Sequence, residues 1–113
     1  MKFNMKYKNK QIIIDLGCGT GNELKKYYKK YNIIGIDIDP ENIQICKKNM
    51  PEGTWIIDDV SKFKFENIKN IKKIICTEVI EHVDDWKSVI KNLNKIQNNT
   101  ELYLTVPDKT SEK

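Results

Sequence analysis

A glycine-rich turn follows a short apolar run near the start of this chain, in the segment IIIDLGCGTGNEL at residues 12–24. The run predicts a buried strand over residues 11–16 that ends at Gly17. A turn of this kind between a strand and a helix usually holds phosphate at the helix N-terminus. No lysine or arginine stands beside this one. The turn therefore needs a ligand that can be held without a basic side chain.

Strand signals recur along the rest of the chain. Short runs rich in isoleucine and other strand-forming residues predict four further strands. These runs are NIIGIDI (residues 32–38), TWIID (54–58), IKKIICT (71–77) and ELYLTV (101–106). The segment at residues 60–70, between the third and fourth strands, is ambiguous.

Helix signals alternate with these strands. Apolar residues within 24–31 follow the spacing i, i+3, i+4, i+7 and have lysines on the opposite side, which predicts an amphipathic helix. Asp39, Pro40 and Glu41 supply an N-cap, a first-position proline and an acidic first turn for a helix that ends near residue 50. A third helix is predicted from about residue 85.

The alternation of strands and helices predicts an α/β fold with a parallel sheet, right-handed crossovers and helices on both faces. At 113 residues the chain is expected to form a single domain, residues 1–113. Ligands of such sheets bind beyond the carboxyl ends of the strands. The glycine turn after the first strand lies at that edge.

Composition disfavours several classes of protein. Charged residues are mixed in sign and no apolar run reaches membrane length, which predicts a globular protein with no membrane segment. The basic start lacks the apolar region of a signal peptide, so we expect a cytoplasmic protein whose three separate cysteines are reduced. All basic charge is lysine and the net charge is only +4. These features favour solvated lysine faces and a frayed basic N-terminus over a nucleic-acid surface.

The spacing of the glycines narrows the choice of ligand. A nucleotide-hydrolase loop needs a lysine after the glycines, and none is present. Gly17, Gly19 and Gly21 read G-x-G-x-G, whereas a dinucleotide site reads G-x-G-x-x-G. Asp15 and Glu23 flank the turn, and two acidic groups oppose a pyrophosphate. The turn therefore suits a ligand with positive charge, such as the sulfonium and ammonium of S-adenosylmethionine, and disfavours a nicotinamide-dependent dehydrogenase.

Four motifs in order along the chain resemble class I S-adenosylmethionine-dependent methyltransferases. DLGCGTG resembles the first motif, IIGIDIDPENI the second strand and helix cap, and IIDDVSKF the third-strand motif. CTEVIEHVDDW resembles the segment after strand four in small-molecule methyltransferases of the quinone-biosynthesis type. The resemblance implies a Rossmann-like three-layer sandwich with a mostly parallel five-stranded sheet in the order 3-2-1-4-5. It also implies S-adenosylmethionine as cofactor and S-adenosylhomocysteine as product.

The resemblance assigns cofactor contacts residue by residue. Asp37 would bind both ribose hydroxyls, Ile38 would pack on the adenine, and Asp59 would accept from the adenine amino group. Asp58 or Asp59 is alternatively only a turn residue, and Asp39 only a helix cap. The implied cofactor-binding residues are Asp15, Gly17, Cys18, Gly19, Gly21, Asp37, Ile38, Asp59, Val60 and Thr77.

Candidate catalytic residues follow the fourth strand. Methyl transfer is a displacement at carbon, so the protein mainly aligns the nucleophile, and a general base is optional. His82 is the only histidine, and its ordinary pKa of about 6.5 suits a base; Glu78 would line the methionine end of the cofactor. A structural role for His82 is the alternative. EVIEHV also resembles the metal-binding segment of small-RNA 2′-hydroxyl methyltransferases, but that site uses a second histidine that this chain lacks, so no metal is expected.

Two functions remain open from the sequence. The first is a methyltransferase that acts on an unidentified O, N or C nucleophile of a small-molecule or macromolecular acceptor. The second is a truncated S-adenosylmethionine-binding module, inactive alone or a subunit of a partner enzyme, because the usual last two strands of the family do not follow the fifth. That fifth strand would form a sheet edge at which a second copy or a partner chain is expected to pair.

Overall fold

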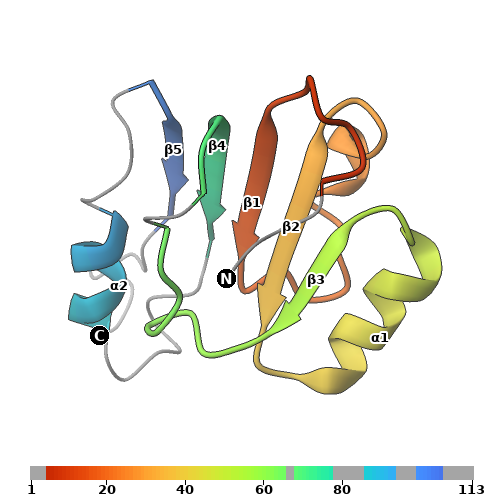
Figure 1. Ribbon diagram of the computed structural model, residues 1–113. Helices are drawn as coiled ribbons and strands as arrows, with labels where there is room; N and C mark the ends of the chain where they lie inside the picture. Colours follow the sequence, from red (N-terminus) through yellow and green to blue (C-terminus); the bar gives the residue numbers. More distant parts are fainter. Residues whose placement is uncertain (1–4, 66–67, 78–85, 94–98, 106–113) are drawn as a thin grey trace.

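The computed structural model describes residues 5–65, 68–77, 86–93 and 99–105. Its strands form one sheet in which every neighbouring pair is parallel (Figure 1). The strands are β1 (Ile12–Leu16), β2 (Asn32–Asp37), β3 (Thr54–Ile57), β4 (Ile71–Cys76) and β5 (Glu101–Leu104). Their spatial order is β3-β2-β1-β4-β5. The predicted α/β class and strand order are confirmed.

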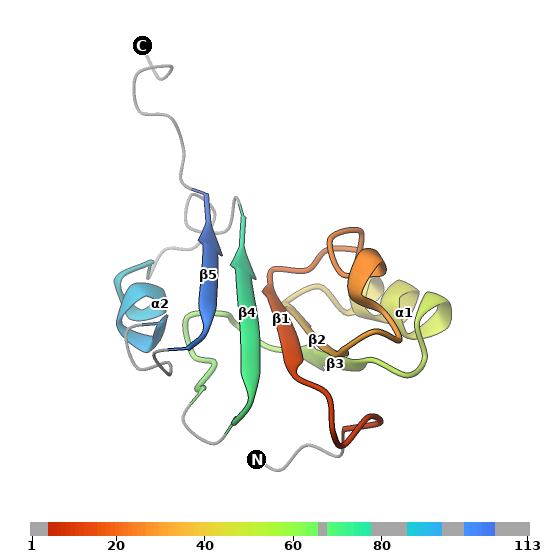
Figure 2. The same cartoon turned by 90° about the horizontal axis from the view of Figure 1, so that it is seen from above.

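Helices cover the two faces of this sheet. α1 (Pro40–Asn49) lies on one face and α2 (Trp86–Leu93) on the other, with the sheet between them (Figure 2). This arrangement is the predicted three-layer sandwich. Within the described ranges, neither helix is long and apolar enough to cross a membrane.

Two apolar cores fill the spaces between the sheet and the helices. Alternate residues of β1 divide between them, because successive side chains of a strand point to opposite faces. Ile12 and Ile14 join the core that includes Val89 of α2. Ile13 joins the core that includes Ile43 of α1. Both faces of the strand are therefore apolar, as expected for a parallel sheet that is covered on each side.

The start of α1 matches the signals in the sequence. The Asp39 carboxylate accepts a hydrogen bond from the Glu41 backbone N–H at 2.9 Å, and Pro40 occupies the first helical position. Ile43 and Cys46 are the fully buried residues of the helix. The helix thus lies against the sheet along one narrow apolar stripe and exposes its other side.

The helix predicted over residues 24–31 is wrong. That segment contains only a 3-10 turn at Lys25–Tyr27, and Lys29 has a left-handed φ of 68° that a helix cannot accommodate. Hydrogen bonds three residues apart, such as Leu24 N–H to Gly21 O at 3.1 Å, tighten the backbone here. Leu24 is nevertheless fully buried. The apolar spacing is therefore satisfied by packing from a turn, without a regular helix.

The ambiguous segment after β3 is irregular but buried. Phe63 and Phe65 meet edge to face, with ring centroids 5.2 Å apart, inside the core under α2. Asn92 of α2 donates from its amide to the carbonyl oxygens of Ser61 at 3.2 Å and Phe63 at 3.1 Å. A buried backbone without a strand partner needs such side-chain partners. The segment thus packs as a loop tied to α2.

Gly35 of β2 allows the Trp55 indole to lie against the sheet. A Cβ at Gly35 would come within 2.6 Å of the Trp55 ring atom Cε3 and 2.9 Å of the Cys18 sulfur. We therefore expect Gly35→Ala to lower the free energy of unfolding by about 1–3 kcal/mol through overpacking, measured by urea denaturation. The same substitution in a Trp55→Leu background serves as the control. Its cost should be smaller there, and equal costs in both backgrounds would contradict the steric explanation.

Candidate functional site

The glycine turn lies at the carboxyl edge of the sheet, between the ends of β1 and β2. The backbone N–H groups of Gly17 and Cys18 both donate to the Ile36 carbonyl, at 2.7 Å and 3.0 Å. The turn is therefore fastened to the end of the neighbouring strand. Clefts at this edge are where α/β sheets bind ligands.

The backbone conformation favours glycine at each of the three spaced positions. Gly17, Gly19 and Gly21 have φ values of 73°, 56° and 93°, in a region that side chains disfavour. Gly21 also lies against α1, since a Cβ there would lie 2.6 Å from the Met50 terminal methyl and 3.3 Å from the Cys46 sulfur. The turn thus owes its shape to backbone freedom and to close packing on the helix.

The carboxylate of Asp37 joins the turn after β1 to the turn after β2. Its Oδ2 accepts from the Gly19 backbone N–H at 2.8 Å, and its Oδ1 accepts from the Asp39 N–H at 2.9 Å. Hydrogen bonds to an ionised carboxylate are the stronger kind. Asp37 is only partly buried. It therefore holds the two turns together while part of the carboxylate stays accessible.

Asp15 is a buried carboxyl group that lacks a protein partner. It is 2% exposed, and its Oδ1 is the buried side-chain oxygen or nitrogen with no hydrogen-bond partner among the residues that the structure describes. Burial, together with the smaller effects of the negative charges of Glu23 and Asp37, raises the pKa of Asp15 to about 7. An unpaired buried carboxyl group is costly. Its position behind the glycine turn favours a ligand group that carries positive charge or donates a hydrogen bond.

Two cysteine thiols support the same turn from the core side. Cys46 Sγ donates to the Gly19 carbonyl at 3.3 Å, and Cys18 Sγ lies 3.6 Å from that oxygen. Burial raises the pKa of both thiols, so both stay protonated and can donate. The Cys18 side chain thus belongs to the core under α1, and only its backbone faces the turn.

The ends of β2 and β3 carry the remaining predicted contacts. Ile38 is 69% exposed at the carboxyl edge. Asp59 Oδ1 accepts from the Ser61 N–H at 2.9 Å and hydroxyl at 2.8 Å, and these bonds lower the pKa of Asp59. Val60 is buried in the core under α2, and half-buried Thr77 directly follows β4. Asp59 therefore stabilises the turn after β3 through Oδ1, which is the structural role considered for it from the sequence.

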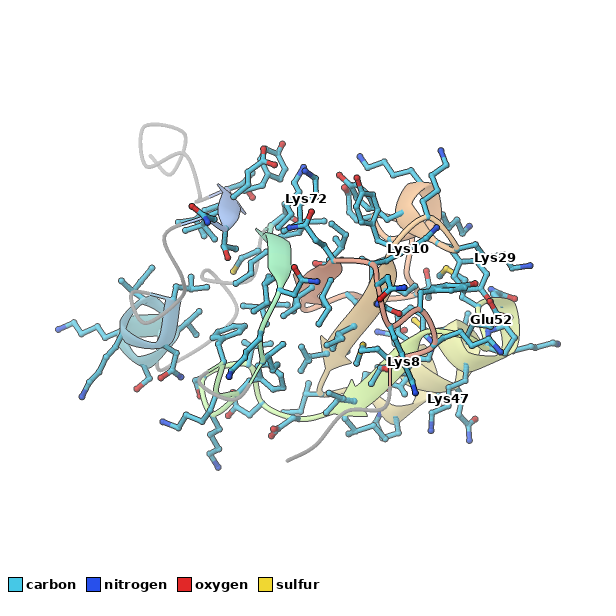
Figure 3. All side chains as sticks on the ribbon, turned by 45° about the horizontal axis from the view of Figure 1, so that its top comes forward. Lys8, Lys10, Lys29, Lys47, Glu52 and Lys72 are labelled. Atoms are coloured by element: carbon cyan, nitrogen blue, oxygen red, sulfur yellow. The ribbon has the colours of Figure 1, made fainter. Side chains whose placement is uncertain are left out.

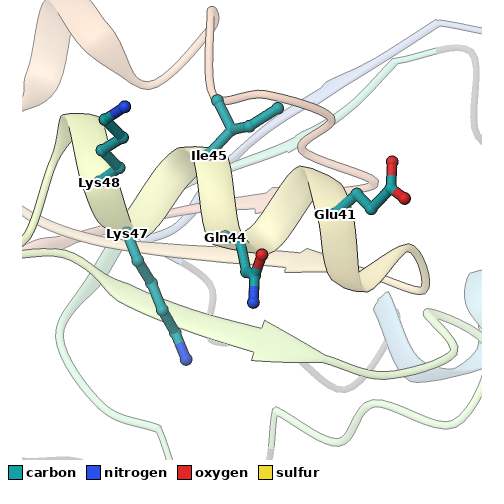
Figure 4. Close-up of a pocket in the computed structure, with 5 residues that line it drawn as sticks. All are labelled: Glu41, Gln44, Ile45, Lys47 and Lys48. Carbon is teal, nitrogen blue, oxygen red and sulfur yellow. The ribbon is translucent and has the colours of Figure 1, made fainter.

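The predicted catalytic residues Glu78 and His82 lie outside the residues that the structure describes. Within the described ranges, no group of three or more His, Cys, Asp or Glu side chains is placed to hold a metal ion. A shallow hollow also occurs on the outer side of α1, lined by Glu41, Gln44, Ile45, Lys47 and Lys48 (Figure 4). All of these side chains come from one helix. The hollow therefore lacks the convergent polar groups of a small-molecule site.

Comparison with known proteins identifies the family. The family model for the methyltransferase domain matches residues 3–113. The chain belongs to this methyltransferase domain family. The class of protein that the motifs resemble is thereby confirmed.

Known relatives of this methyltransferase domain are longer proteins. It is 28% identical over 107 residues to N-methyltransferase 4 of Papaver somniferum, an alignment covering 88% of the chain and 30% of that relative. It is 27% identical over 85 residues to the ubiquinone biosynthesis O-methyltransferase of Vibrio campbellii (strain ATCC BAA-1116), covering 71% and 36% respectively. The chain thus spans about a third of the length of these relatives.

A solved methyltransferase structure shares the fold. The plantazolicin methyltransferase BpumL in complex with SAH matches with a TM-score of 0.71 at 23% identity, over 84% of this chain and 38% of that one. This similarity places the methyltransferase domain in the Rossmann-like α/β class that the motifs imply.

The glycine turn of this methyltransferase domain was predicted from the sequence, but the side chains of other elements that contact the turn were not. The structure brings Asp15, Gly19 and Asp37 together, as the motif order predicts. Cys46 of α1 and Met50, the residue directly after α1, also contact or closely approach the turn, and neither contact can be read from the local sequence. Their only signal is the spacing i, i+4 on the buried stripe of a helix, which predicts burial without naming the contact.

Proposed function

We propose that the chain binds S-adenosylmethionine at the glycine turn and transfers its methyl group to an O, N or C nucleophile of an acceptor. The observation that carries the proposal is the buried, unpartnered carboxyl group of Asp15 behind a glycine turn with no basic neighbour. Membership of the methyltransferase domain family and the fold shared with a methyltransferase bound to SAH support it.

Each part of the cofactor has matching groups along the carboxyl edge. Asp15 accepts from or neutralises the ammonium. The glycine turn (Gly17, Cys18, Gly19 and Gly21) lets the methionine end of the cofactor approach the backbone closely, because its glycines carry no side chains. Asp37 has lone pairs beyond the two used by backbone N–H groups, and these accept from the ribose hydroxyls. The exposed Ile38 side chain packs on the adenine ring. Asp59 accepts a hydrogen bond from the adenine amino group, and the Val60 N–H donates to a ring nitrogen. Thr77, at the end of β4, lines the methionine end.

The chain's own catalytic work is mainly positional. Bound S-adenosylmethionine supplies a methyl group on a sulfonium sulfur, which is a strong leaving group. The residues after Thr77 orient the acceptor beside that methyl group, and correct alignment accounts for much of the rate enhancement of such a displacement. We assign the removal of a proton from the acceptor to His82, assisted by Glu78.

The proposal extends to the methyl acceptor and to protein partners. A small molecule or a macromolecule can serve as acceptor. The outer backbone edge of β5, the last strand in the sheet order, is where we place a second copy or a partner chain. We also propose a cytoplasmic location, because Cys18, Cys46 and Cys76 are free thiols.

Calorimetric titration of the purified chain tests the proposal. We expect micromolar binding of S-adenosylmethionine and S-adenosylhomocysteine and no binding of NADH or ATP. A folded chain that binds NADH but neither sulfur compound would overturn the assignment. Turnover with candidate acceptors then separates an enzyme from a binding module, and His82→Ala should reduce turnover while cofactor affinity stays within about twofold.

A further inference from the structure

Tyrosine and lysine side chains gather on a second surface of the chain. The chain has five tyrosines, and four of them carry a lysine ammonium 5.4–5.7 Å from the ring centroid. A lysine ammonium above a tyrosine ring is attracted by the electron-rich face of the ring. We call these residues the tyrosine–lysine surface: Tyr7, Lys10, Lys26, Tyr27, Tyr28, Lys29, Tyr31, Lys73 and Tyr103.

One part of this surface runs from β5 across β4. Lys73 pairs in register with Ile13, so its side chain points to the α1 side of the sheet. Its ammonium lies 3.0 Å from the Tyr27 hydroxyl and also over the Tyr103 ring, at 5.4 Å from the centroid. The Tyr27 ring meets Tyr31 edge to face at 6.0 Å. Three elements far apart in the sequence therefore contribute to one patch.

The other part is anchored through Glu52. The Glu52 backbone N–H donates to the Tyr28 hydroxyl at 3.1 Å, and the Tyr7 hydroxyl donates to the Glu52 carboxylate. Figure 3 shows Lys10, Lys29 and Glu52 on the same side of the molecule. Because Tyr28 directly follows Tyr27, the two parts meet at this pair of residues.

The basic N-terminal stretch is fixed in place. The Asn32 side chain, 4% exposed, accepts from the Tyr7 N–H at 2.8 Å and donates to the carbonyls of Tyr7 at 2.5 Å and Lys10 at 3.0 Å. The expectation of a frayed basic terminus is therefore wrong for residues 5–10. This stretch lies at the amino edge of the sheet, so the length of β1, about 17 Å, separates it from the glycine turn.

Lysines outnumber acidic residues on this surface, where Glu52 accepts from Tyr7 and a Glu23 carboxylate oxygen lies 3.8 Å from the Lys26 ammonium. Residues 5–10 and 25–30 contribute Lys6, Lys8, Lys10, Lys25, Lys26, Lys29 and Lys30 and no acidic residue. A lysine-rich surface with an exposed ring at Tyr103, beside the half-buried rings of the other tyrosines, matches a polymer that carries both phosphates and bases. The ammonium groups track the phosphate backbone, and the exposed ring stacks on a base. An acidic peptide would use the charges but not the rings.

We propose that the tyrosine–lysine surface binds single-stranded nucleic acid. Lysine contacts phosphate as a point charge and the chain has no arginine for bidentate reading of guanine, so the binding is insensitive to base sequence. The proposal stands apart from methyl transfer and holds whether or not the bound strand is the acceptor.

Fluorescence anisotropy with labelled oligouridine and oligothymidine tests the proposal. We expect binding at low salt that weakens steeply as salt rises, since phosphate contacts release counterions. The double variant Lys26→Gln/Lys29→Gln should weaken binding about tenfold, whereas the matched variant Lys62→Gln/Lys64→Gln, with equal charge loss at exposed lysines elsewhere, should change it less than twofold. Equal losses from both variants, or no binding at low salt, would overturn the proposal. RNA and DNA strands in parallel identify which backbone is preferred.

A second pair of variants separates stacking from charge. Tyr103→Ala should weaken oligouridine binding about five- to tenfold but leave inorganic polyphosphate binding unchanged. Leu102→Ala, on the opposite face of β5 and of similar exposure, is the control and should change neither. If polyglutamate binds as tightly as oligouridine, any acidic polymer suffices, and the nucleic-acid assignment is contradicted. The assignment is also contradicted if the Tyr103→Ala variant binds oligouridine normally.

Discussion

Asp37→Ala is expected to weaken S-adenosylmethionine binding by at least about 100-fold. The carboxylate holds the Gly19 and Asp39 N–H groups at 2.8 Å and 2.9 Å, and it is the proposed acceptor for the ribose hydroxyls. Each hydrogen bond to a charged group contributes about 1.5–3 kcal/mol, and about 1.4 kcal/mol is a tenfold change in affinity. Removing the side chain therefore loses both direct contacts and the shape of the turn. Calorimetric titration of the folded variant measures the change.

Asp58→Ala is the matched control for Asp37→Ala. Asp58 is the first residue after β3, is similarly half-buried, and accepts from only its neighbour, the Asp59 N–H, at 2.8 Å. We expect its affinity for the cofactor to stay within about threefold of the unmodified chain. If Asp37→Ala binds as tightly as Asp58→Ala, the ribose assignment is refuted. Urea denaturation of both variants shows whether the turn itself is lost.

The stability of the ligand-free chain should fall as pH rises from about 4 to about 7 because of Asp15. The folded chain keeps a proton on this buried carboxyl group up to a pKa of about 7, whereas the unfolded chain releases it near 3.8. The folded state therefore binds more protons in this window, and its stability declines until Asp15 is ionised in both states. The difference corresponds to about 4 kcal/mol. Urea denaturation at a series of pH values measures it.

Asp15→Asn isolates this contribution from other titrating groups. The amide is close in shape and stays neutral, so the variant should lose the decline between pH 4 and 7 and be more stable than the unmodified chain at pH 8. Its cofactor affinity should be lower, because the variant lacks the charge that we propose faces the ammonium. Parallel pH profiles for the two proteins would show that Asp15 ionises normally. Saturating S-adenosylmethionine should flatten the profile of the unmodified chain if the ammonium compensates the buried charge.

Most of the architecture could be predicted because its signals are local and agree with each other. Runs of isoleucine and other strand-forming residues indicated the strands, and the sequence from Asp39 to Glu41 indicated the start of α1. The helix prediction for residues 24–31 was wrong because the spacing of apolar residues indicates only which side chains are buried. A tight turn that ends at left-handed Lys29 buries Leu24 as well as a helix would. Tertiary packing decided between the two, and a local pattern contains no information about it.

The candidate site was predictable only where a residue type is itself diagnostic. Spaced glycines and the acidic residues Asp15 and Asp37 indicate a turn and its ligand without a structure. The support of the Gly19 carbonyl by Cys46 depends on how α1 lies against the sheet. The anchoring of residues 5–10 depends on Asn32, 25 residues after Tyr7. Such contacts between distant segments leave no periodic signal.

The contact between Gly35 and Trp55 also bears on how the sheet finds its alignment. β1, β2 and β4 carry isoleucine on both faces, so a slip of one residue would still bury isoleucine, and hydrophobicity alone discriminates poorly against misaligned pairings. Gly35 pairs with Trp55 in the native register. A shift in either direction would place Ile34 or Ile36 against the indole. The absence of a side chain at Gly35 therefore favours the native alignment of β2 with β3 over shifted alignments. A larger residue at position 35 would first be seen as slow, heterogeneous refolding.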